Sequence, residues 1–423
     1  AGALEETYRS RNAGKKHVPA DRIDRVMTHR IWGLPIFLLL MWITFQATFS
    51  LGGIPAEWME AGVQWLGDWV TGLMPEGSLR ELLVGGIISG VGGVIVFLPN
   101  ILILFFFISL MEDTGYMARA AFIMDKLMHK IGLHGKSFIP LLMGFGCNVP
   151  AIMATRTLES RKDRVMTMLI IPFMSCSARL PVYVLLISAF FPHNQGLVLF
   201  SIYLIGILIA VLSSVLFKKL LFAKQEAPFV MELPPYRIPT VHNVVRHMWD
   251  KGAQYLKKMG TVILLASIII WALGHYPRNV EYSTDYAAEK ALVAASDQSA
   301  EEKQAQIQHL DNSQYAEHQE KSYIGRIGHF IEPAIRPLGF DWRIGVSLAS
   351  GLAAKEVIVS TMAVLNNSGD DETMLARNLQ KQTYASGPKA GEHVYTPLVA
   401  YTLMIFILLY FPCIAAMAAM QGK

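Results

Sequence analysis

Five long runs of the sequence contain no charged side chain. Each run reaches or approaches the roughly 20 residues that a helix needs to cross the hydrocarbon core of a bilayer. The runs are Ile31–Ser50, Leu82–Met111, Leu197–Phe217, Met259–Pro277 and Pro397–Gly422. This pattern predicts an all-α protein that crosses a membrane several times.

The composition agrees with a membrane protein. The 423 residues are 53% hydrophobic and 17% charged, whereas soluble domains carry about 25% charged residues. Residues 1–30 contain neither the apolar core nor the small-residue cleavage site of a signal peptide. All three cysteines, Cys147, Cys176 and Cys413, lie in apolar segments, so a disulfide scaffold is not expected.

The charged residues between the apolar runs predict the topology. Residues 1–30 carry a net charge of +3, residues 218–258 a net +5 and residues 276–325 a net −5. Because basic loops stay on the cytoplasmic side, the first two segments are predicted to be cytoplasmic and a segment over 276–330 extracytoplasmic. The predicted divisions are a cytoplasmic linker (1–30), a first membrane half (31–217), a connecting segment (218–258) and a second membrane half (259–423).

Two segments fit this topology only if they enter and leave the membrane on the same side. A full crossing by residues 138–157 would place the basic residues 159–164 outside, against the positive-inside rule. Residues 342–362 stand between two outward segments in the same way. Residues 54–75, with three tryptophans, have the pattern of an amphipathic helix lying on the outer surface; these are Trp58, Trp65 and Trp69.

The two re-entrant segments resemble each other weakly. At a constant offset of 207 residues, Gly132 aligns with Gly339 and Gly144 with Gly351, while Cys147 falls on Ala354. Weak similarity between halves of opposite orientation is typical of transporter repeats. Unwound backbone at membrane depth is tolerated where it lines a cavity, so two inverted, broken elements predict a substrate site between them.

The first broken element contains "GFGCNVP" (144–150). Gly144 and Gly146 permit a turn, and Pro150 suits the first turn of a new helix. Cys147 and Asn148 would then lie beside free backbone groups. Cys176 and Cys413 each lie near a proline in a later apolar run. Thiolate and thioether groups suit soft and borderline metals, so these residues are the candidate ligands, assisted by Met143 and Met174. The alternative is that the cysteines are small packing residues.

Ionisable residues inside apolar segments are the second functional signal. Arg179, Lys355 and Glu356 lie within such segments, and Glu112 and Asp113 end the second apolar run. They are candidates for gating and for the ion path. The alternatives are a local Lys355–Glu356 ion pair, an Arg179 pairing with one of the acids, and a cytoplasmic-mouth position for Glu112 and Asp113.

No nucleotide-binding motif is evident. The sequence "HGKS" (134–137) ends like a phosphate-binding loop, but Lys130 occupies the position where that loop needs its first glycine. Nothing in the sequence predicts binding of nucleic acid.

Several segments resemble the membrane domain of the bacterial ferrous iron transport protein B family. They are "DRIDRVMTHRIWGLPIFLLLMW", "FLPNILILFFFISLMEDTGYMARAAFIMD", "GFGCNVPAIMATRTLESRKDR", "PFMSCSARLPVYVLL" and "SGLAAKEVIVSTM". The resemblance implies an Fe²⁺ importer of the bacterial inner membrane, with paired gate repeats similar in plan to nucleoside-transporter hairpins. By this resemblance the two predicted re-entrant segments are the gate repeats, and we call residues 138–157 gate 1 and residues 342–362 gate 2. It also implies that Cys147 and Cys176 handle the metal, and Cys413 matches a third family cysteine.

The resemblance further implies a longer protein. Members of the family carry an N-terminal GTPase domain, which would bring GTP and Mg²⁺, and a last membrane helix beyond the end of this chain. The implied partners are membrane lipid, that GTPase domain, a small cytoplasmic accessory protein and other copies in a homo-oligomer.

The expected function is therefore transport and not enzymatic catalysis. One alternative is a nucleoside-type carrier of organic solutes with the same hairpin plan. Another is a membrane-embedded thiol enzyme, which needs a general base within reach of its cysteine; no intramembrane histidine is evident near Cys147 or Cys176. A receptor or scaffold would have no use for inverted, broken elements.

Overall fold

The computed structural model describes residues 24–421 except for 30–31, 76, 89–91, 93–94, 97, 222–235, 237–238, 279, 296–299, 367–371 and 384–391. Within these ranges the regular secondary structure is helical, and a single β-bridge joins Thr383 to His393. The predicted all-α class is confirmed. Most of the predicted linker and much of the connecting segment lie outside the described residues.

The described helices from α3 to α12 begin within the predicted first membrane half. They are α3 (Gly33–Leu73), α4 (Ser78–Glu81), η1 (Leu82–Ile88), α6 (Leu98–Asp113), α7 (Tyr116–Ile131), η2 (Gly135–Ser137), α8 (Phe138–Gly146), α9 (Asn148–Ala154), η3 (Thr155–Thr157), α10 (Arg161–Ile170), η4 (Ile171–Phe173), η5 (Ser177–Arg179), α11 (Leu180–Phe190) and α12 (Gln195–Leu221).

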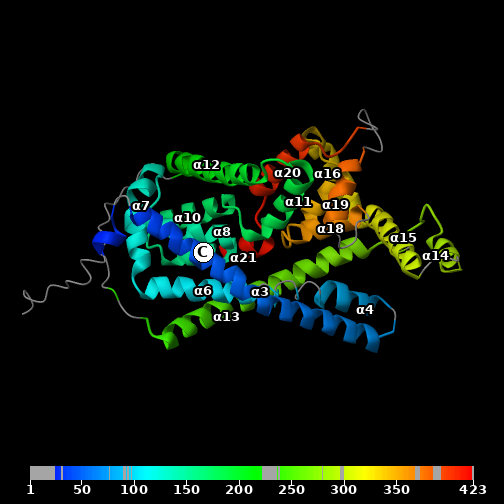
Figure 1. Ribbon diagram of the computed structural model, residues 1–423, viewed down its shortest axis with the longest axis horizontal. Coiled ribbons are helices and arrows are strands. Elements are labelled where there is room, and N and C mark those ends of the chain that lie inside the picture. Colours follow the sequence, from blue (N-terminus) through cyan, green and yellow to red (C-terminus); the bar gives the residue numbers. More distant parts are fainter. Residues whose placement is uncertain are drawn as a thin grey trace, which may run out of the picture.

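The remaining helices follow from α13 onward. They are α13 (Val241–His275), α14 (Tyr286–Ala295), α15 (Ala300–Lys321), α16 (Tyr323–Ile335), η6 (Arg336–Leu338), α17 (Trp342–Ser350), α18 (Val357–Leu365), α19 (Glu372–Lys381), α20 (Pro397–Leu409) and α21 (Ile414–Met420). Figure 1 shows α6, α7, α8 and α10 toward one end of an elongated molecule and α16 to α19 toward the other, with α14 and α15 projecting beyond them.

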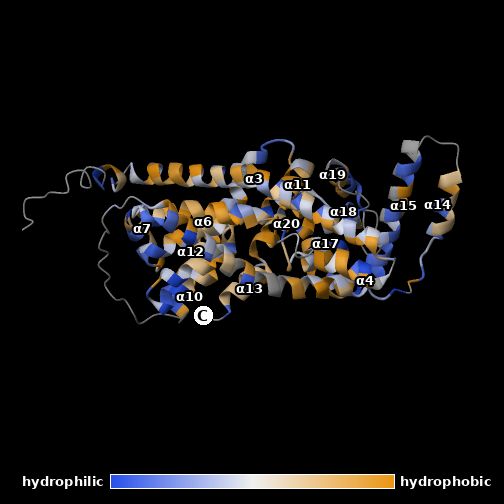
Figure 2. Cartoon of the chain, turned by 90° about the horizontal axis from the view of Figure 1, so that it is seen from below, coloured by the Kyte–Doolittle hydropathy of each residue, from blue (hydrophilic) through white to orange (hydrophobic). Residues whose placement is uncertain are grey.

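Four segments among the described residues are long and apolar enough to cross a membrane. They are Gly33–Leu73, Arg161–Phe190, Gln195–Leu220 and Pro397–Met420. The pair α6 and α7 would add a fifth, but it is bent by 82°. The chain is thus a multi-pass integral membrane protein, and the hydrophilic α15 contrasts with the apolar length of α3 in Figure 2.

The N-terminal helix α3 differs from the prediction. It continues without a break through Gly52, Gly53 and Pro55 for 41 residues, or about 60 Å. The separate surface helix predicted for 54–75 is therefore wrong, because its tryptophans belong to the far end of α3. Gly52 is needed where α3 crosses α6, since a Cβ there would meet Asn100 Oδ1 at 1.9 Å.

The second apolar run is also not a simple span. It divides into the π-helix η1 and the α-helix α6, and α6 ends at a bend whose Gly115 has a φ of 79°. Beyond the bend, α7 packs against η2 and α8, the start of gate 1. The chain after α6 therefore leads directly into the first broken element.

Arg119 holds the bend between α6 and α7. Its Nη1 donates to the Gly115 carbonyl at 3.0 Å, and its Nε and Nη2 donate to the two Asp24 oxygens at 2.7 and 3.3 Å. Tyr236 donates its hydroxyl to Asp24 at 2.7 Å, and the Arg119 guanidinium stands 3.7 Å from the centre of the Tyr236 ring. One buried guanidinium therefore joins the bend to two segments that are far away in the sequence.

Two large hydrophobic clusters and a small third one around Ile324, Val346 and Leu365 form the interior of the described part of the chain. One large cluster contains side chains of α6 to α10 together with α21, and the other large cluster contains side chains of α11, α12 and α16 to α20. In a membrane such contacts act through close packing and not through exclusion of water. The element before each gate ends at an aligned glycine with left-handed backbone, Gly132 with a φ of 87° and Gly339 with a φ of 83°.

Replacing Asp24 by Asn should lower the melting temperature of the purified protein at about pH 7, by roughly 2 °C for each kcal/mol lost. The hydrogen bond from Arg119 holds the pKa of Asp24 below its ordinary value. This stabilisation is complete above the ordinary pKa of about 4 and is lost as the pH falls through the lowered value. The gap between wild type and Asp24→Asn should therefore close in acid. Glu57→Gln, at an exposed acid of α3, is the control. A difference in melting temperature between wild type and Asp24→Asn that did not change with pH would contradict the role given to the Asp24 carboxylate.

Candidate metal site at the broken helices

A cavity of about 1730 Å³ lies between the two halves of the molecule. All three cysteines line it, together with Asn148, Lys355 and Glu356. Its wall also includes residues of α3, α6, α13 and α15. The structure therefore brings most of the predicted chemistry-bearing residues to one cavity.

Gate 1 is broken at Cys147. Helix α8 ends at Gly146, Cys147 has an extended backbone (φ −149°, ψ 129°) and α9 begins at Asn148. Pro150 lies in the first turn of α9, where a backbone N–H is not needed. The Asn148 side chain is 4% exposed, and its Oδ1 has no hydrogen-bond partner among the described residues. The break leaves an unused acceptor oxygen beside the thiol.

Cys176 also lies at a break between helices. The chain is extended at Met174 and at Cys176, between η4 and η5. The buried Arg179 donates from Nη1 to the carbonyls of Pro172 and Met174, both at 3.2 Å. Arg179 makes no ion pair with an acid among the described residues, so the acid pairing considered as an alternative from the sequence is absent there. Its Nη1 satisfies unwound backbone, while its Nε and Nη2 have no hydrogen-bond partner among the described residues.

Gate 2 is broken over Gly351–Glu356, between α17 and α18. Lys355 is 2% exposed; its Nζ donates to the Phe411 carbonyl at 2.8 Å and stands 3.2 Å from the centre of the Tyr410 ring. It makes no ion pair with Glu356, so the local pair considered from the sequence is absent between these two described residues.

Cys413 occupies a fourth break, between α20 and α21, with an extended backbone (φ −60°, ψ 154°). The next residue, Ile414, donates its N–H to the Leu352 carbonyl of gate 2 at 2.8 Å. Similarly, Ser177 directly follows Cys176, and its hydroxyl donates to the Gly146 carbonyl of gate 1 at 2.8 Å. Each gate is thus hydrogen-bonded to the residue that follows one of the two later cysteines.

The aligned glycines permit these contacts. A Cβ on Gly144 would lie 3.0 Å from the Met174 Cβ, and one on Gly351 would lie 2.8 Å from the Tyr410 hydroxyl. Both partners belong to the short segments that precede Cys176 and Cys413. A larger residue at Gly144 would press on the segment before Cys176, whereas one at Gly351 would press first on Ile358 of gate 2, at 2.4 Å, and then on Tyr410.

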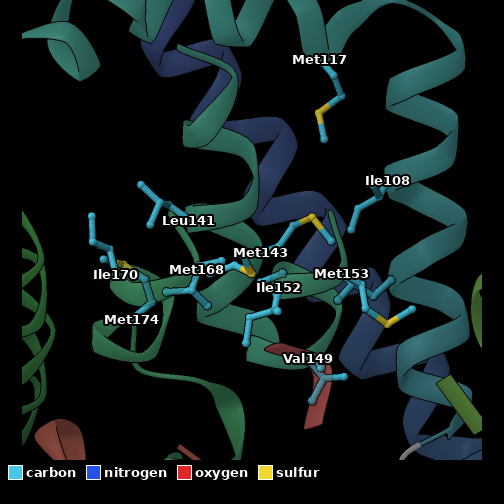
Figure 3. Close-up of a cluster of buried hydrophobic side chains, with 14 of the residues drawn as sticks. Ile108, Met117, Leu141, Met143, Val149, Ile152, Met153, Met168, Ile170 and Met174 are labelled. Atoms are coloured by element: carbon cyan, nitrogen blue, oxygen red, sulfur yellow. The ribbon is translucent and has the colours of Figure 1, made fainter. Parts of the chain in front are cut away.

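Several predicted site residues lie elsewhere. Met143 and Met174 point into the hydrophobic cluster of Figure 3, where they are 2% and 5% exposed. Glu112 and Asp113 lie at the end of α6 and do not line the cavity. Across the described ranges, no group of three or more His, Cys, Asp or Glu side chains is arranged to hold a metal ion. The three thiols share a cavity without forming a closed coordination shell.

The cavity wall also contains residues that sequence reasoning did not select. They are Glu81, His275, His318 and Asp311, which lie on α4, α13 and α15. Their only sequence signal is that Glu81 and His275 stand at the ends of charge-free runs. The fold brings Glu81 and His275, which are far apart in the sequence, to the same region of the cavity wall, which we call the mouth of the cavity.

Comparison with known proteins places the chain in a family. The model described as nucleoside recognition, the gate family, matches residues 94–190 and 256–422, more than half of the chain. The chain belongs to the gate family. A second model, described as ferrous iron transport protein B C terminus, matches residues 199–251. The two gate-family matches include both broken elements and all three cysteines.

Similar proteins within the gate family carry transporter names. A protein of Porphyromonas gingivalis, named as a fusion of Fe(2+) transport protein A with the Fe(2+) transporter FeoB, is 57% identical over 99% of this chain and 50% of its own length. The Fe(2+) transporter FeoB of Campylobacter jejuni is 44% identical over 93% of this chain and 59% of its own length. That of Staphylococcus aureus is 40% identical over 96% and 55%.

These relatives confirm the resemblance to the ferrous iron transport protein B family and are named as transporters, the class expected from the sequence. The gate-family chain described here spans about half the length of the relatives it matches. No solved structure shows a significant match to it.

Replacing Arg179 by Met should loosen the Cys176 segment. The carbonyls of Met174, which is buried, and of Pro172, which is partly buried, would lose their donor, at up to about 1 to 3 kcal/mol each. Cys176, now 8% exposed, should then react faster with a maleimide. Arg179→Lys, which keeps one donor group, should show a smaller effect.

The measurement is the labelling rate of Cys176 in a protein whose other two cysteines are serine, together with thermal unfolding. Arg156→Gln, at an exposed arginine after α9, is the control. Wild-type labelling and stability in Arg179→Met would show that the carbonyl contacts do not hold the segment.

Proposed function

We propose that this chain is the metal-conducting membrane part of an Fe²⁺ importer of the bacterial inner membrane. The observation that carries the proposal is the position of Cys147, Cys176 and Cys413. Each lies on extended backbone at a helix break, and all three face one cavity. Sulfur ligands suit borderline metals, and three packing cysteines would have no reason to share this placement.

The charge of the region favours anionic ligands over water or carbonyl groups alone. Arg179 and Lys355 are buried cations close to the cavity, while Glu356 is the carboxylate beside them. A dication in such surroundings needs negative partners, because an unpaired buried charge is costly. Thiolates from the cysteines supply them, and the free Oδ1 of Asn148 is a further ligand.

We propose that gates 1 and 2 form an inverted pair whose movements alternate access to this site. Support comes from the aligned positions: Gly132 and Gly339 share left-handed backbone, and Gly144 and Gly351 each permit a close contact with the segment before a cysteine. In this scheme the gate bounds, the two membrane halves and the cytoplasmic N-terminus remain as predicted from the sequence.

Regulation in the intact protein is proposed to come from outside this chain. The relatives are considerably longer, which supports an additional domain, and the family implies a GTPase with bound GTP and Mg²⁺ connected through residues 1–30. The name of the Porphyromonas protein, in which Fe(2+) transport protein A is fused to the transporter, supports a small accessory protein as partner.

X-ray absorption at the iron edge tests the thiol site directly. In full-length protein loaded with Fe²⁺ under anaerobic, reducing conditions, we expect scattering from sulfur at a distance of about 2.3 Å from the iron, as for other metal–thiolate bonds. Cys147→Ser and Cys176→Ser should each weaken or abolish it, whereas Met143→Leu, a change in the hydrophobic cluster, should leave it unchanged. If the iron had only oxygen ligands and neither serine variant changed them, the cysteines would be packing residues and not metal ligands.

The family description favours one second candidate, a carrier of nucleosides. Such a carrier needs side chains that recognise a base and a ribose, and its cysteines would be incidental. Proteoliposomes that accumulate labelled nucleoside, with uptake unaffected by Cys147→Ser and without Fe²⁺ transport, would support this candidate and reject the iron proposal.

A further inference from the structure

The cavity has a second polar region away from the thiols. Glu81, at the end of α4, and His275, at the end of α13, both line it, as does His318 of α15. Glu81 and His275 are 45% and 20% exposed at the side chain, so hydrated ions can reach them. Residues 276–325, with a net charge of −5, place this mouth on the predicted outer side.

A guanidinium holds the first two of these residues together. Arg278 Nε donates to His275 Nε2 at 3.0 Å, and Arg278 Nη2 donates to Glu81 Oε2 at 3.1 Å. Because a guanidinium is only a donor, the Nε2 atom must present its lone pair, which makes His275 neutral with its proton on Nδ1. An imidazole nitrogen and a carboxylate oxygen thus converge on one cation.

The spacing of these two acceptors also suits a metal ion. His275 Nε2 and Glu81 Oε2 are 3.1 Å apart. Two adjacent ligands at right angles, each about 2.1 Å from a divalent ion, would be about 3.0 Å apart. Imidazole and carboxylate are ligands that suit Fe²⁺ as well as Zn²⁺ and Mn²⁺. The pair needs little rearrangement to accept such an ion in place of the guanidinium.

The neighbouring contacts hold His275 in this orientation. The Trp271 ring stacks on the His275 ring at 4.6 Å and 14°, and the same tryptophan packs against Gly85 of η1, the element that follows Glu81. His318 Nε2 contacts the His275 carbonyl at 3.1 Å. The histidine and the glutamate are therefore positioned by the same packed contact between α13 and η1.

We propose that Glu81 and His275 form a transient outer-mouth site for a hydrated divalent cation, and that Arg278 is a built-in competitor which the arriving cation displaces. This inference rests on the proposed transport of Fe²⁺. Two protein ligands leave most of the ion's coordination positions to water, so the site delivers the ion onward and does not trap it. Removal of water is then completed deeper in the cavity, where the thiols lie.

The test is the concentration dependence of initial Fe²⁺ uptake by the full-length protein in liposomes under anaerobic conditions. Loss of a ligand in Glu81→Gln or His275→Gln should raise the half-saturating Fe²⁺ concentration about tenfold or more with little change in maximal rate. Arg278→Gln should lower that concentration several-fold, because the competitor is gone. Misfolding cannot produce the last result.

Lys321→Gln is the matched control. Lys321 pairs with Glu317 at 2.9 Å on the same outer segment, so this variant removes one positive charge without touching the mouth and should leave the half-saturating concentration unchanged. If Lys321→Gln and Arg278→Gln lowered the half-saturating Fe²⁺ concentration equally, the cause would be the loss of positive surface charge. That result would overturn the inference. Unchanged uptake in all three mouth variants would also overturn it while leaving the proposed function standing.

A binding experiment separates the two proposals. Mn²⁺ is titrated into protein with all three cysteines replaced by serine, and free Mn²⁺ is followed by electron paramagnetic resonance. Binding that Glu81→Gln abolishes and Arg278→Gln strengthens would support the outer-mouth site even if no Fe²⁺ were transported, which would reject the proposed function alone. Binding that is unaffected by both variants would reject the outer-mouth site.

Discussion

The arrangement of the site depends on one constraint: backbone that unwinds inside a membrane must find hydrogen-bond partners within the protein. This chain unwinds at four places along one cavity, at Cys147, Cys176, Gly351–Glu356 and Cys413. The breaks satisfy one another. Ser177 donates to gate 1, and Ile414 donates to gate 2, while Lys355 of gate 2 donates back to the segment before Cys413. Each break takes a hydrogen-bond partner from a neighbouring break, so gate 1 is coupled to the Cys176 segment and gate 2 to the Cys413 segment.

The same constraint explains why cations lie beside a site proposed for a cation. Arg179 donates to the carbonyls exposed before Cys176, and Lys355 to one exposed before Cys413. Their positive charge is the consequence of stabilising carbonyl-rich backbone at depth. It also raises the requirement for negative ligands, because Glu356 alone cannot balance two buried cations and an incoming dication. Three thiols that can become thiolates in contact with a metal meet this requirement, whereas polar groups suited to an uncharged nucleoside would not.

The sequence predicted the helix breaks at Cys147 and over Gly351–Glu356 because the signals for these breaks are local. Glycine and proline clusters mark Cys147 directly, and the aligned glycines mark both gates. It failed where the deciding contact is distant. Gly52, Gly53 and Pro55 resemble a helix end, yet α3 continues through them, and Gly52 lies against the distant Asn100 of α6. The break at Cys176 depends on Arg179 reaching back to Pro172. The mouth pairs Glu81 with a histidine almost 200 residues later, which no local pattern encodes.

Arg119 connects the helices that lead into gate 1 to the segment before α3 and to the connecting segment. Its guanidinium binds the Gly115 carbonyl at the bend, Asp24 before the first helix and the ring face of Tyr236 in the connecting segment. From the bend, α7 runs to the Gly132 turn, where Asp125 accepts the Gly135 N–H at 3.0 Å and fixes the start of gate 1. Only α8 then separates this contact from Cys147. A displacement of Asp24 would remove the carboxylate that accepts two hydrogen bonds from this buried guanidinium, and the cost would fall on the bend from which α7 leads to the break. The segments that contain Asp24 and Tyr236 are thus connected to gate 1 through Arg119, the helix α7 and the Asp125–Gly135 hydrogen bond.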